Sequence, residues 1–297
     1  MTRLNNKSNE IFFDPSTEVR GLKPRLLMAF TSIYAKISKT GSAKFALNQL
    51  FKPHSRRDYA FRTKKRPSKT YKVKTIKGQV ALHHFLGSEN KHVLLSHGWA
   101  DTSVRFTHLI DHLVSEGFDV WAFDHIGHGK SEGNTAHLFG FVDDVKESLK
   151  FIEYQGHEVV SIIGHSMGAL AVLNQTTPHL KNKRIVMISA PTDFFENLFI
   201  NTKKFGLSNK MLLNSLEFLS DIYGTEWPEL SPKKQTHKIG SHFLMVHDKG
   251  DPTCSYESFK ELVELTNHEF MTTETLGHLK ILKDKVVLKR ISDFILI

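Results

Sequence analysis

Residues 164–168 of this sequence, GHSMG, have a clear chemical signature. They follow an apolar run of strand length, Val159–Ile163, and precede a helical pattern. A serine on such a sharp strand-to-helix turn has a crowded backbone, and glycines two residues before and two after it relieve that crowding. The pattern therefore predicts that Ser166 is a nucleophile and that Gly164 and Gly168 support its turn.

A serine hydroxyl is a weak nucleophile until a base takes its proton, so a histidine and a carboxylate are expected later in the chain. His278 follows the last strand candidate, at the end of a strand where open α/β sheets place their sites. The strand candidate 242–247 leads into a loop with two acids, Asp248 and Asp251. Asp251, just before a proline, suits a carboxylate directed at the histidine, and Asp248 is expected to shape the loop.

Acyl transfer also requires hydrogen-bond donors for the developing oxyanion. The first expected donor is the backbone N–H of Met167, the residue after the nucleophile. The second is the N–H of Trp99, in the loop that follows the strand candidate 92–96, with His97 and Gly98 supporting that loop. The alternative is that His97 and Gly98 form an ordinary turn.

Residues 124–131, DHIGHGKS, raise the question of a metal site. Their spacing fits no zinc pattern, and the two glycines suit a strand-to-helix loop, so we expect neither a metal nor an organic cofactor. Cys254 is the one cysteine of the chain, which excludes an intrachain disulfide and fits a reducing compartment.

Short β-rich runs alternate with helical patterns from about Tyr71 onward. Strands are expected at residues 71–76, 79–85, 92–96, 118–123, 158–163, 184–189, 242–247 and 270–273. Helices are expected at residues 104–115, 141–154, 167–174, 256–266 and 286–294. This alternation predicts an α/β fold with a doubly wound, mostly parallel sheet, and the first two strands are expected to form an antiparallel hairpin.

Three parts follow from these patterns: a basic helical extension and linker at 1–70, an α/β core at 71–190 and 241–297, and a short helical cap insertion at 191–240. The pattern at 22–51 predicts a helix broken at Gly41. Its apolar positions are Leu26, Leu27, Phe30, Ile33, Tyr34 and Ile37. We expect this stripe to pack on the main domain; the alternative is a helix on a membrane surface followed by a basic anchor.

The net charge of +9 is unevenly distributed. Residues 1–74 hold 18 Lys and Arg against 4 Asp and Glu, and the remainder holds 22 against 27. No nucleic-acid motif accompanies the basic segment, so we expect a solvated surface and no nucleic-acid partner. The first 20 residues lack the apolar core of a secretory signal, and no apolar run reaches membrane-spanning length, so a cytoplasmic location is expected.

Taken together, these motifs resemble the α/β-hydrolase family over about residues 71–297. The family pattern is matched in order by HGW at 97–99, DHIGHGKS at 124–131, GHSMG at 164–168, Asp251 and His278. The resemblance implies a serine hydrolase of carboxylic esters whose catalytic triad is Ser166, Asp251 and His278, and it implies that residues 191–240 cap the site.

The GHSMG turn at 164–168 and the run FVDDV at 141–145 are also similar to those of monoglyceride-lipase and lysophospholipase relatives. The basic N-terminal helix and Trp99 are similar to uncharacterised bacterial hydrolases. The expected substrate is a small-molecule ester with an apolar acyl or alcohol group. A thioesterase, an acyltransferase or a non-enzymatic ligand-binding relative are the alternatives, whereas Ser166 argues against dehalogenases and epoxide hydrolases, which use an aspartate there.

Overall fold

The computed structural model describes residues 21–53, 60–240, 242–266, 268 and 270–296 of the chain. It divides into two compact units. The sheet unit comprises Pro53–Thr192 and Pro232–Ile297, and the helical unit joins the N-terminal helices, up to Lys52, to Asp193–Ser231. Sequence patterns assign the N-terminal helices and the insertion to separate segments, whereas the structure groups them in one unit.

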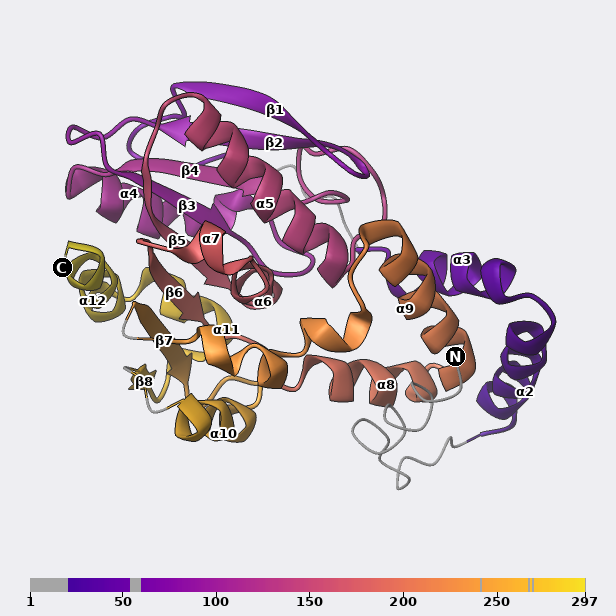
Figure 1. Cartoon of the computed structure of the whole chain (residues 1–297). Helices are drawn as coiled ribbons and strands as arrows, with labels where there is room; N and C mark the ends of the chain where they lie inside the picture. The colour runs from indigo at the N-terminus through magenta and orange to yellow at the C-terminus, as the bar shows by residue number, and fades with distance from the viewer. Residues whose placement is uncertain (1–20, 54–59, 241, 267, 269, 297) are drawn as a thin grey trace. The chain divides into compact units, whose positions relative to one another are not determined.

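The sheet unit is built on eight strands in the order β1-β2-β4-β3-β5-β6-β7-β8 (Figure 1). Their bounds are β1 Lys69–Thr75, β2 Gly78–Phe85, β3 His92–Ser96, β4 Asp119–Asp124, β5 Val159–His165, β6 Arg184–Ile188, β7 Phe243–Asp248 and β8 Phe270–Thr273. β2 pairs antiparallel with both β1 and β4, and the remaining pairs are parallel. This confirms the predicted mostly parallel α/β sheet and its antiparallel hairpin.

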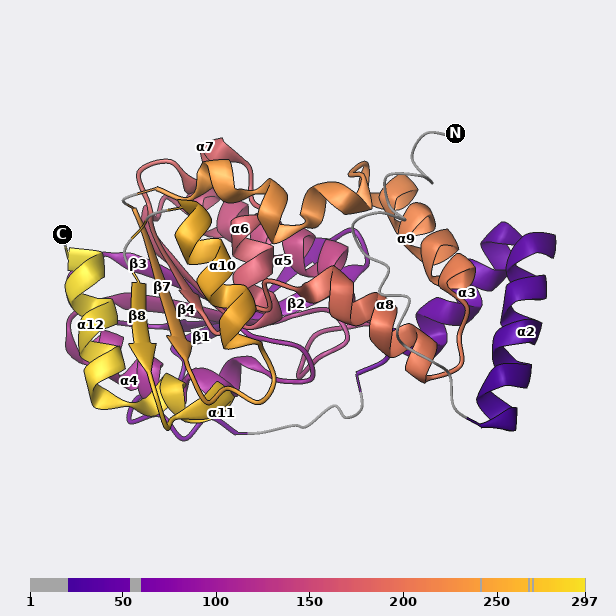
Figure 2. The same cartoon turned by 90° about the horizontal axis from the view of Figure 1, so that it is seen from below.

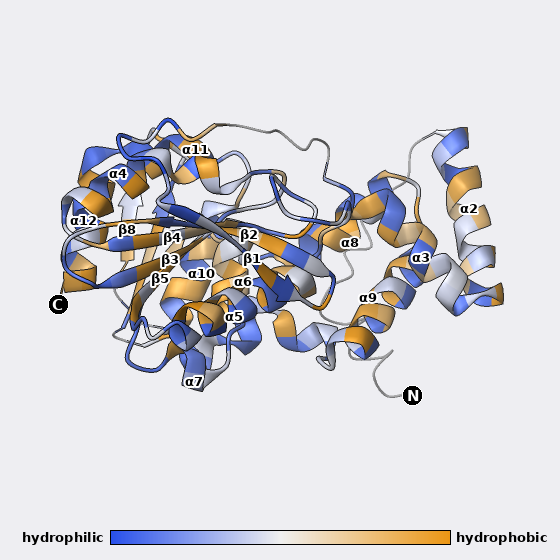
Figure 3. Cartoon of the chain, turned by 90° about the horizontal axis from the view of Figure 1, so that it is seen from above, coloured by the Kyte–Doolittle hydropathy of each residue, from blue (hydrophilic) through white to orange (hydrophobic). Residues whose placement is uncertain are grey.

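Helices cover both faces of this sheet, with α4, α11 and α12 on one face and α5, α6 and α10 on the other (Figure 3). The helices are α4 Thr107–Ser115, α5 Leu138–Tyr154, α6 Met167–Leu173, α7 Thr177–Leu180, α10 Tyr256–Thr266, α11 Gly277–Lys280 and α12 Lys285–Leu296. Short 3-10 turns lie at Ser103–Phe106, Pro232–Lys234, Thr236–Lys238 and Ile281–Lys283. Because both faces are covered, β3 and β4 are buried along their whole length.

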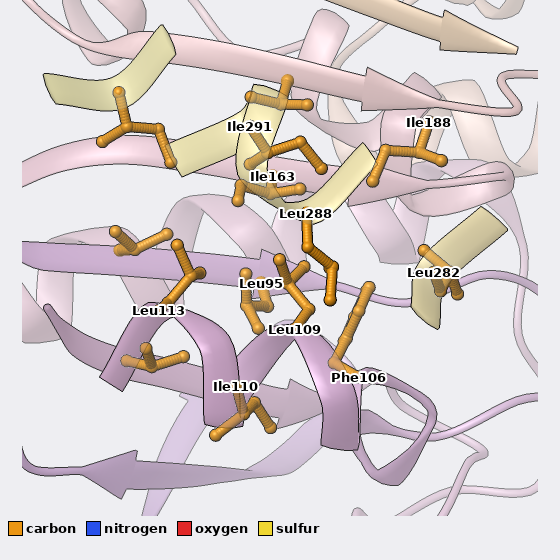
Figure 4. Packing of buried hydrophobic residues seen from close by; sticks show 14 of the residues in the cluster. Leu95, Phe106, Leu109, Ile110, Leu113, Ile163, Ile188, Leu282, Leu288 and Ile291 are labelled. Carbon is orange, nitrogen blue, oxygen red and sulfur yellow. The ribbon is translucent and has the colours of Figure 1, made fainter. Parts of the chain in front are cut away.

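The core on the α4 and α12 side consists of aliphatic and aromatic side chains from helix and strand together (Figure 4). Leu109 and Leu113 of α4 meet Ile163 of β5 and the α12 residues Leu288 and Ile291 in this cluster. Each of these side chains is buried. Burying one of them fully contributes about 1.5–3 kcal/mol, so this packing fixes the sheet whose strand ends carry the candidate site.

The helical unit contains α2 Leu22–Ile37, α3 Lys39–Leu50, α8 Phe194–Lys204, α9 Asn209–Tyr223 and the 3-10 turn Trp227–Leu230. α2 and α3 both lie beside α9 (Figures 1 and 2). Small side chains permit this close approach, since Ala35 and Ala46 are buried with Met211. The amide of Asn214 donates to the Ala35 carbonyl and to Ser42 Oγ, both at 2.9 Å, which joins helices nearly 180 residues apart in sequence.

The break in the N-terminal helical segment lies at Ser38, so the prediction of a break at Gly41 is wrong. Ser38 has extended backbone angles, and its Oγ accepts the Gly41 N–H at 3.1 Å, which caps the start of α3. Gly41 lies inside α3, where a β-carbon would be 2.6 Å from both Ser38 Oγ and Tyr34 Oη. Its glycine reflects close packing and not a helix end.

Within the helical unit, α2 does not pack through its apolar stripe, and the packing of that stripe on the main domain stays a prediction. Of its six positions, Tyr34 is half-buried and five are exposed: Leu26, Leu27, Phe30, Ile33 and Ile37. The buried positions of α2 are instead the small residues Thr31 and Ala35. Among the described residues, no helix combines the length and the apolar character that crossing a bilayer requires.

Candidate active site

Ser166 lies in the sharp turn between β5 and α6, at φ 54° and ψ −127°. A non-glycine residue at positive φ costs about 1–3 kcal/mol and persists only where its surroundings hold it. The turn is held by the hydrogen bond from the Ser166 N–H to the Ile188 carbonyl of β6, at 2.9 Å. The side chain is nearly buried, with 9% of the residue's surface exposed.

The two glycines of the pentapeptide lie where neighbouring backbone leaves no room for a side chain. A β-carbon on Gly164 would be 2.5 Å from the Ala169 α-carbon. One on Gly168 would be 2.2 Å from the Ser96 carbonyl oxygen, at the end of β3. Replacing either glycine would therefore move the turn that carries the serine.

The loop after β3 passes directly against the serine. A β-carbon on Gly98 would be 2.8 Å from the Ser166 β-carbon and 3.2 Å from its Oγ. The next residue, Trp99, is half-buried, and Met167 on the other side of the serine is buried. Within the described residues, neither the Trp99 N–H nor the Met167 N–H donates to an acceptor of the protein. Both donors are therefore available to a ligand.

His97 holds this loop as a neutral ring in one tautomer. Its Nε2 accepts the N–H of His125 at 3.0 Å, so the proton is on Nδ1, which donates to the Gly98 carbonyl at 2.7 Å. Burial lowers the pKa of His97. His128 acts in the same way, because its Nε2 accepts the Ala100 N–H at 3.0 Å and burial lowers its pKa to about 3.

The segment at residues 124–131 is organised around the buried carboxylate of Asp124. That carboxylate accepts the N–H and the hydroxyl of Ser103 and the N–H of Lys130, at 2.7–2.9 Å. Burial opposes its ionisation, but His83 and these donors lower its pKa below the usual range. Gly129 is at φ 44° against the same carboxylate, where a β-carbon would clash. The carboxylate of Asp124 is therefore engaged in holding the shape of this loop.

A buried pair beneath the serine turn, His125 and Asp144, was not identified from the sequence. His125 Nδ1 is hydrogen-bonded to Asp144 Oδ2 at 3.0 Å, and its Nε2 is hydrogen-bonded to Ser96 Oγ at 2.9 Å. The same ring stacks on Phe141, with the ring centroids 3.6 Å apart. Burial lowers the pKa of His125 and raises that of Asp144. Since Ser96 also contacts Gly168, the pair supports the turn from below.

Asp251 is held by backbone donors of its own loop. Its Oδ1 accepts the N–H groups of Thr253 at 2.8 Å and Cys254 at 3.0 Å, which leaves Oδ2 for His278 Nδ1 at 2.7 Å. Burial raises its pKa, but His278 and the two N–H groups outweigh burial and lower the pKa to about 2. Asp251 is therefore ionised at neutral pH.

His278 directly follows Gly277, whose φ of 62° lies in the left-handed region that glycine adopts without strain. The His278 carbonyl accepts a hydrogen bond from His165 Nε2 at 2.9 Å, and the ring centroids of the two histidines lie 4.6 Å apart. His165 is the residue before Ser166, so this contact brings the histidine loop to the serine turn. Burial lowers the pKa of His165 to about 3. Sequence reasoning gave His165 no role, because nothing local indicates a partner 113 residues away.

Asp248, the other candidate acid, binds the loop that precedes the histidine. Its Oδ2 accepts the Thr273 hydroxyl and the Leu276 N–H, the latter at 2.8 Å, and its Oδ1 accepts the Gly250 N–H at 2.9 Å. The structure thus brings Asp251 to His278 and uses Asp248 to shape the surrounding loop.

Among the described residues, two groups of side chains have metal-ligand types and spacing: Asp251, Cys254 and His278, and His84, His92 and Asp119. In the first group, Asp251 and His278 are bonded directly to each other. In the second, His92 Nδ1 accepts from Trp121 Nε1 at 3.0 Å, so its proton is on Nε2, which faces Asn90 at 2.9 Å. A protonated nitrogen cannot ligate a metal, so this second group does not fit one as arranged.

A family model described as serine aminopeptidase, S33, matches residues 87–212, which is fewer than half of the chain. Curated relatives match over short segments. A monoacylglycerol lipase of Mycolicibacterium smegmatis is 37% identical over 81 residues, 26% of this chain and 29% of the relative. Human monoglyceride lipase is 34% identical over 93 residues, 29% of this chain and 30% of the relative. The chain thus spans less than a third of the length of these relatives.

Solved structures cover much more of the chain at lower identity. An esterase of Pyrococcus furiosus aligns with a TM-score of 0.61 and 19% identity, over 83% of this chain and 96% of that one. The Butyrivibrio proteoclasticus protein Est1E, with ferulic acid bound, aligns with a TM-score of 0.59 and 14% identity, over 76% of this chain and 100% of that one. At such identities the likeness concerns the fold.

Proposed function

We propose that this member of the α/β-hydrolase family cleaves carboxylic esters through a covalent acyl-enzyme, with Ser166 as nucleophile, His278 as general base and Asp251 as the group that orients it. The observation that carries the proposal is the 2.7 Å contact of Asp251 with His278 Nδ1, in a loop bonded to the residue before Ser166.

The tautomer of His278 suits a base. The ionised Asp251 accepts a hydrogen bond from the Nδ1–H of His278, so the free lone pair of the ring is on Nε2. His278 takes the Ser166 proton as the hydroxyl attacks the ester carbonyl, and it later gives that proton to the leaving alcohol. Asp251 stabilises the imidazolium formed between these steps. A water molecule, deprotonated by the same histidine, then attacks the acyl-enzyme and releases the carboxylic acid.

The oxyanion is stabilised by the backbone N–H groups of Trp99 and Met167. Their lack of protein acceptors among the described residues supports this role, as does the contact of Gly98 with Ser166. Losing one oxyanion donor costs about 3–4 kcal/mol in hydrolases. The rings of His97 and His128 keep the Trp99 loop in place, and burial lowers the pKa of both.

The proposed substrate has an apolar acyl or alcohol group. This rests on the names of the partial relatives, monoacylglycerol and monoglyceride lipases, and on the Phe-rich residues 191–240. The role of that segment as a cap stays a prediction from the sequence.

The test is a panel of p-nitrophenyl esters of increasing acyl length, run beside labelling with a fluorophosphonate. We expect turnover that rises with acyl length and a single label on Ser166. Ser166→Ala should lose the label and about 10⁵-fold or more of kcat, because it removes the nucleophile. Turnover that survives in Ser166→Ala would contradict the proposal.

Related chemistries are separated in the same experiment. Added alcohols or thiols that divert the acyl group from water would indicate an acyltransferase, and preference for thioesters would indicate a thioesterase. Cleavage of aminoacyl amides in preference to esters would indicate a peptidase, which the name of the matched family raises. Stoichiometric binding of esters without turnover would indicate a ligand-binding protein.

A further inference from the structure

Helix α2 presents its most apolar face to solvent. Five large apolar side chains recur every three or four residues along it and are each more than half exposed: Leu22 74%, Leu26 61%, Phe30 59%, Ile33 59% and Ile37 78%. At about 100° per residue they fall within an arc of about 80°. Contiguous exposed apolar side chains mark interaction sites, whereas apolar side chains scattered singly over a surface are ordinary.

The fold of the helical unit uses the opposite face of the same helix. Thr31 Oγ1 accepts the Ser208 N–H at 3.0 Å, and the Ala35 carbonyl accepts the Asn214 amide at 2.9 Å. Both Thr31 and Ala35 are buried. The apolar stripe is therefore not what anchors α2 in its own unit.

The charges around the stripe indicate what kind of surface it fits. Residues 21–53 contain six Lys and Arg and no Asp or Glu. Arg25 and Lys36 flank the stripe on one side in the helical projection, and Lys23 flanks it on the other. A second copy of this chain would bring like charges together, whereas an anionic surface would be attracted along the whole helix.

We propose that α2 lies on the surface of an anionic lipid membrane. Its apolar stripe enters the boundary between headgroups and acyl chains, and Lys23 and Lys36 lie at the lipid phosphates. The helix has 16 residues, fewer than the roughly 20 needed to span a bilayer, so it lies along the surface. With five inserted side chains, we expect reversible binding that weakens with salt.

The test is co-sedimentation with phosphatidylcholine vesicles that contain or lack phosphatidylserine. All proteins carry Ser166→Ala, so the result does not depend on ester hydrolysis. Leu26→Ser with Ile37→Ser should lower the partition coefficient about tenfold or more. The matched control is Leu265→Ser with Val286→Ser, which changes side chains that are 65% and 67% exposed elsewhere and should leave binding unchanged.

A second measurement covers the case in which the variants fold poorly. A polarity-sensitive label at Ile37→Cys should shift to shorter wavelength with anionic vesicles, while one at Leu265→Cys should not; Cys254 is buried and escapes labelling. Equal sedimentation of the α2 and control pairs, or an unshifted label at 37, would overturn the proposal. A dimer that the α2 pair dissociates, without vesicle binding, would assign the stripe to a second copy instead.

Discussion

Two groups of histidines lie at opposite ends of the same strands, and they differ in what they hold. At the carboxyl ends, the rings of His97, His128 and His165 bond to backbone groups of loops. At the amino end of β3, the His92 ring meets His157 at 4.4 Å and bonds to Trp121, and His84 stacks on Trp121 at 3.7 Å and bonds to Asp119. The first group fixes loops, and the second packs rings on a strand.

The difference is one of backbone contacts. His97 and His128 accept loop N–H groups, and His165 donates to the carbonyl of His278. The hydrogen bonds of His84 and His92 are to side chains: Asp119 and Trp121 of β4, and Asn90 of the loop before β3. Because only the first kind of contact fixes loop positions, we expect histidine changes to affect rate at one end of the sheet and stability at the other.

The largest difference is expected between His278→Ala and His92→Ala. Removing the proposed base should lower kcat about 10⁴-fold or more. Removing His92 should cost about 1–3 kcal/mol in free energy of unfolding, because Trp121 Nε1 loses its acceptor, and should change kcat by less than about threefold. Esterase kinetics and urea unfolding measure the two effects. Comparable kcat losses would end the comparison.

The next largest difference in kcat is expected between variants of two carboxylates, Asp251 at one end of the sheet and Asp119 at the other. Asp251→Asn should lower kcat about 10³–10⁴-fold, because an amide can donate to His278 and favours the wrong tautomer. Asp119→Asn, at the partner of His84, should leave kcat within about threefold.

Asp248→Asn is the control within the same loop. It should lower kcat by about tenfold, through displacement of the residues before His278. If Asp248→Asn proves more damaging than Asp251→Asn, the assignment of the acid is wrong.

The smallest effect is on the pH dependence of stability. The pKa of His128 is about 3 in the folded chain and about 6.5 in an unfolded one, so its stabilisation is present above about pH 6.5 and is lost as pH falls toward 3. His128→Gln should therefore remove about one proton from the uptake on unfolding at pH 5. Urea unfolding between pH 7 and 4 measures this slope, and parallel slopes for wild type and variant would contradict it.

The sequence predicts the sheet well because strands covered on both faces are apolar runs. Every strand begins and ends within two residues of its predicted bounds. Helix α5 begins three residues early, at Leu138, since His137 Nδ1 caps it by accepting the Gly140 N–H at 3.0 Å. Histidine is not among the usual capping residues, so the pattern did not show this start.

The candidate site is only partly readable from the sequence. Ser166, Asp251 and His278 were proposed because glycines and strand ends mark their positions locally. His165 and the pair of His125 with Asp144 were missed, because their roles depend on contacts between distant segments among 18 histidines. The pairing of α3 with α9 was missed for the same reason, and the exposure of the α2 stripe depends on which of its two faces the other helices cover.

The helical insertion has a consequence for how this fold diversifies. It begins after β6 and ends before β7. These two strands pair in continuous register, from Ile185 with Phe243 to Ile188 with Val246. Its two ends are therefore held by the sheet whatever its length, and lengthening a loop with fixed ends costs little free energy. Insertions and deletions here can accumulate during evolution without shifting the strands that carry Ser166 or Asp251.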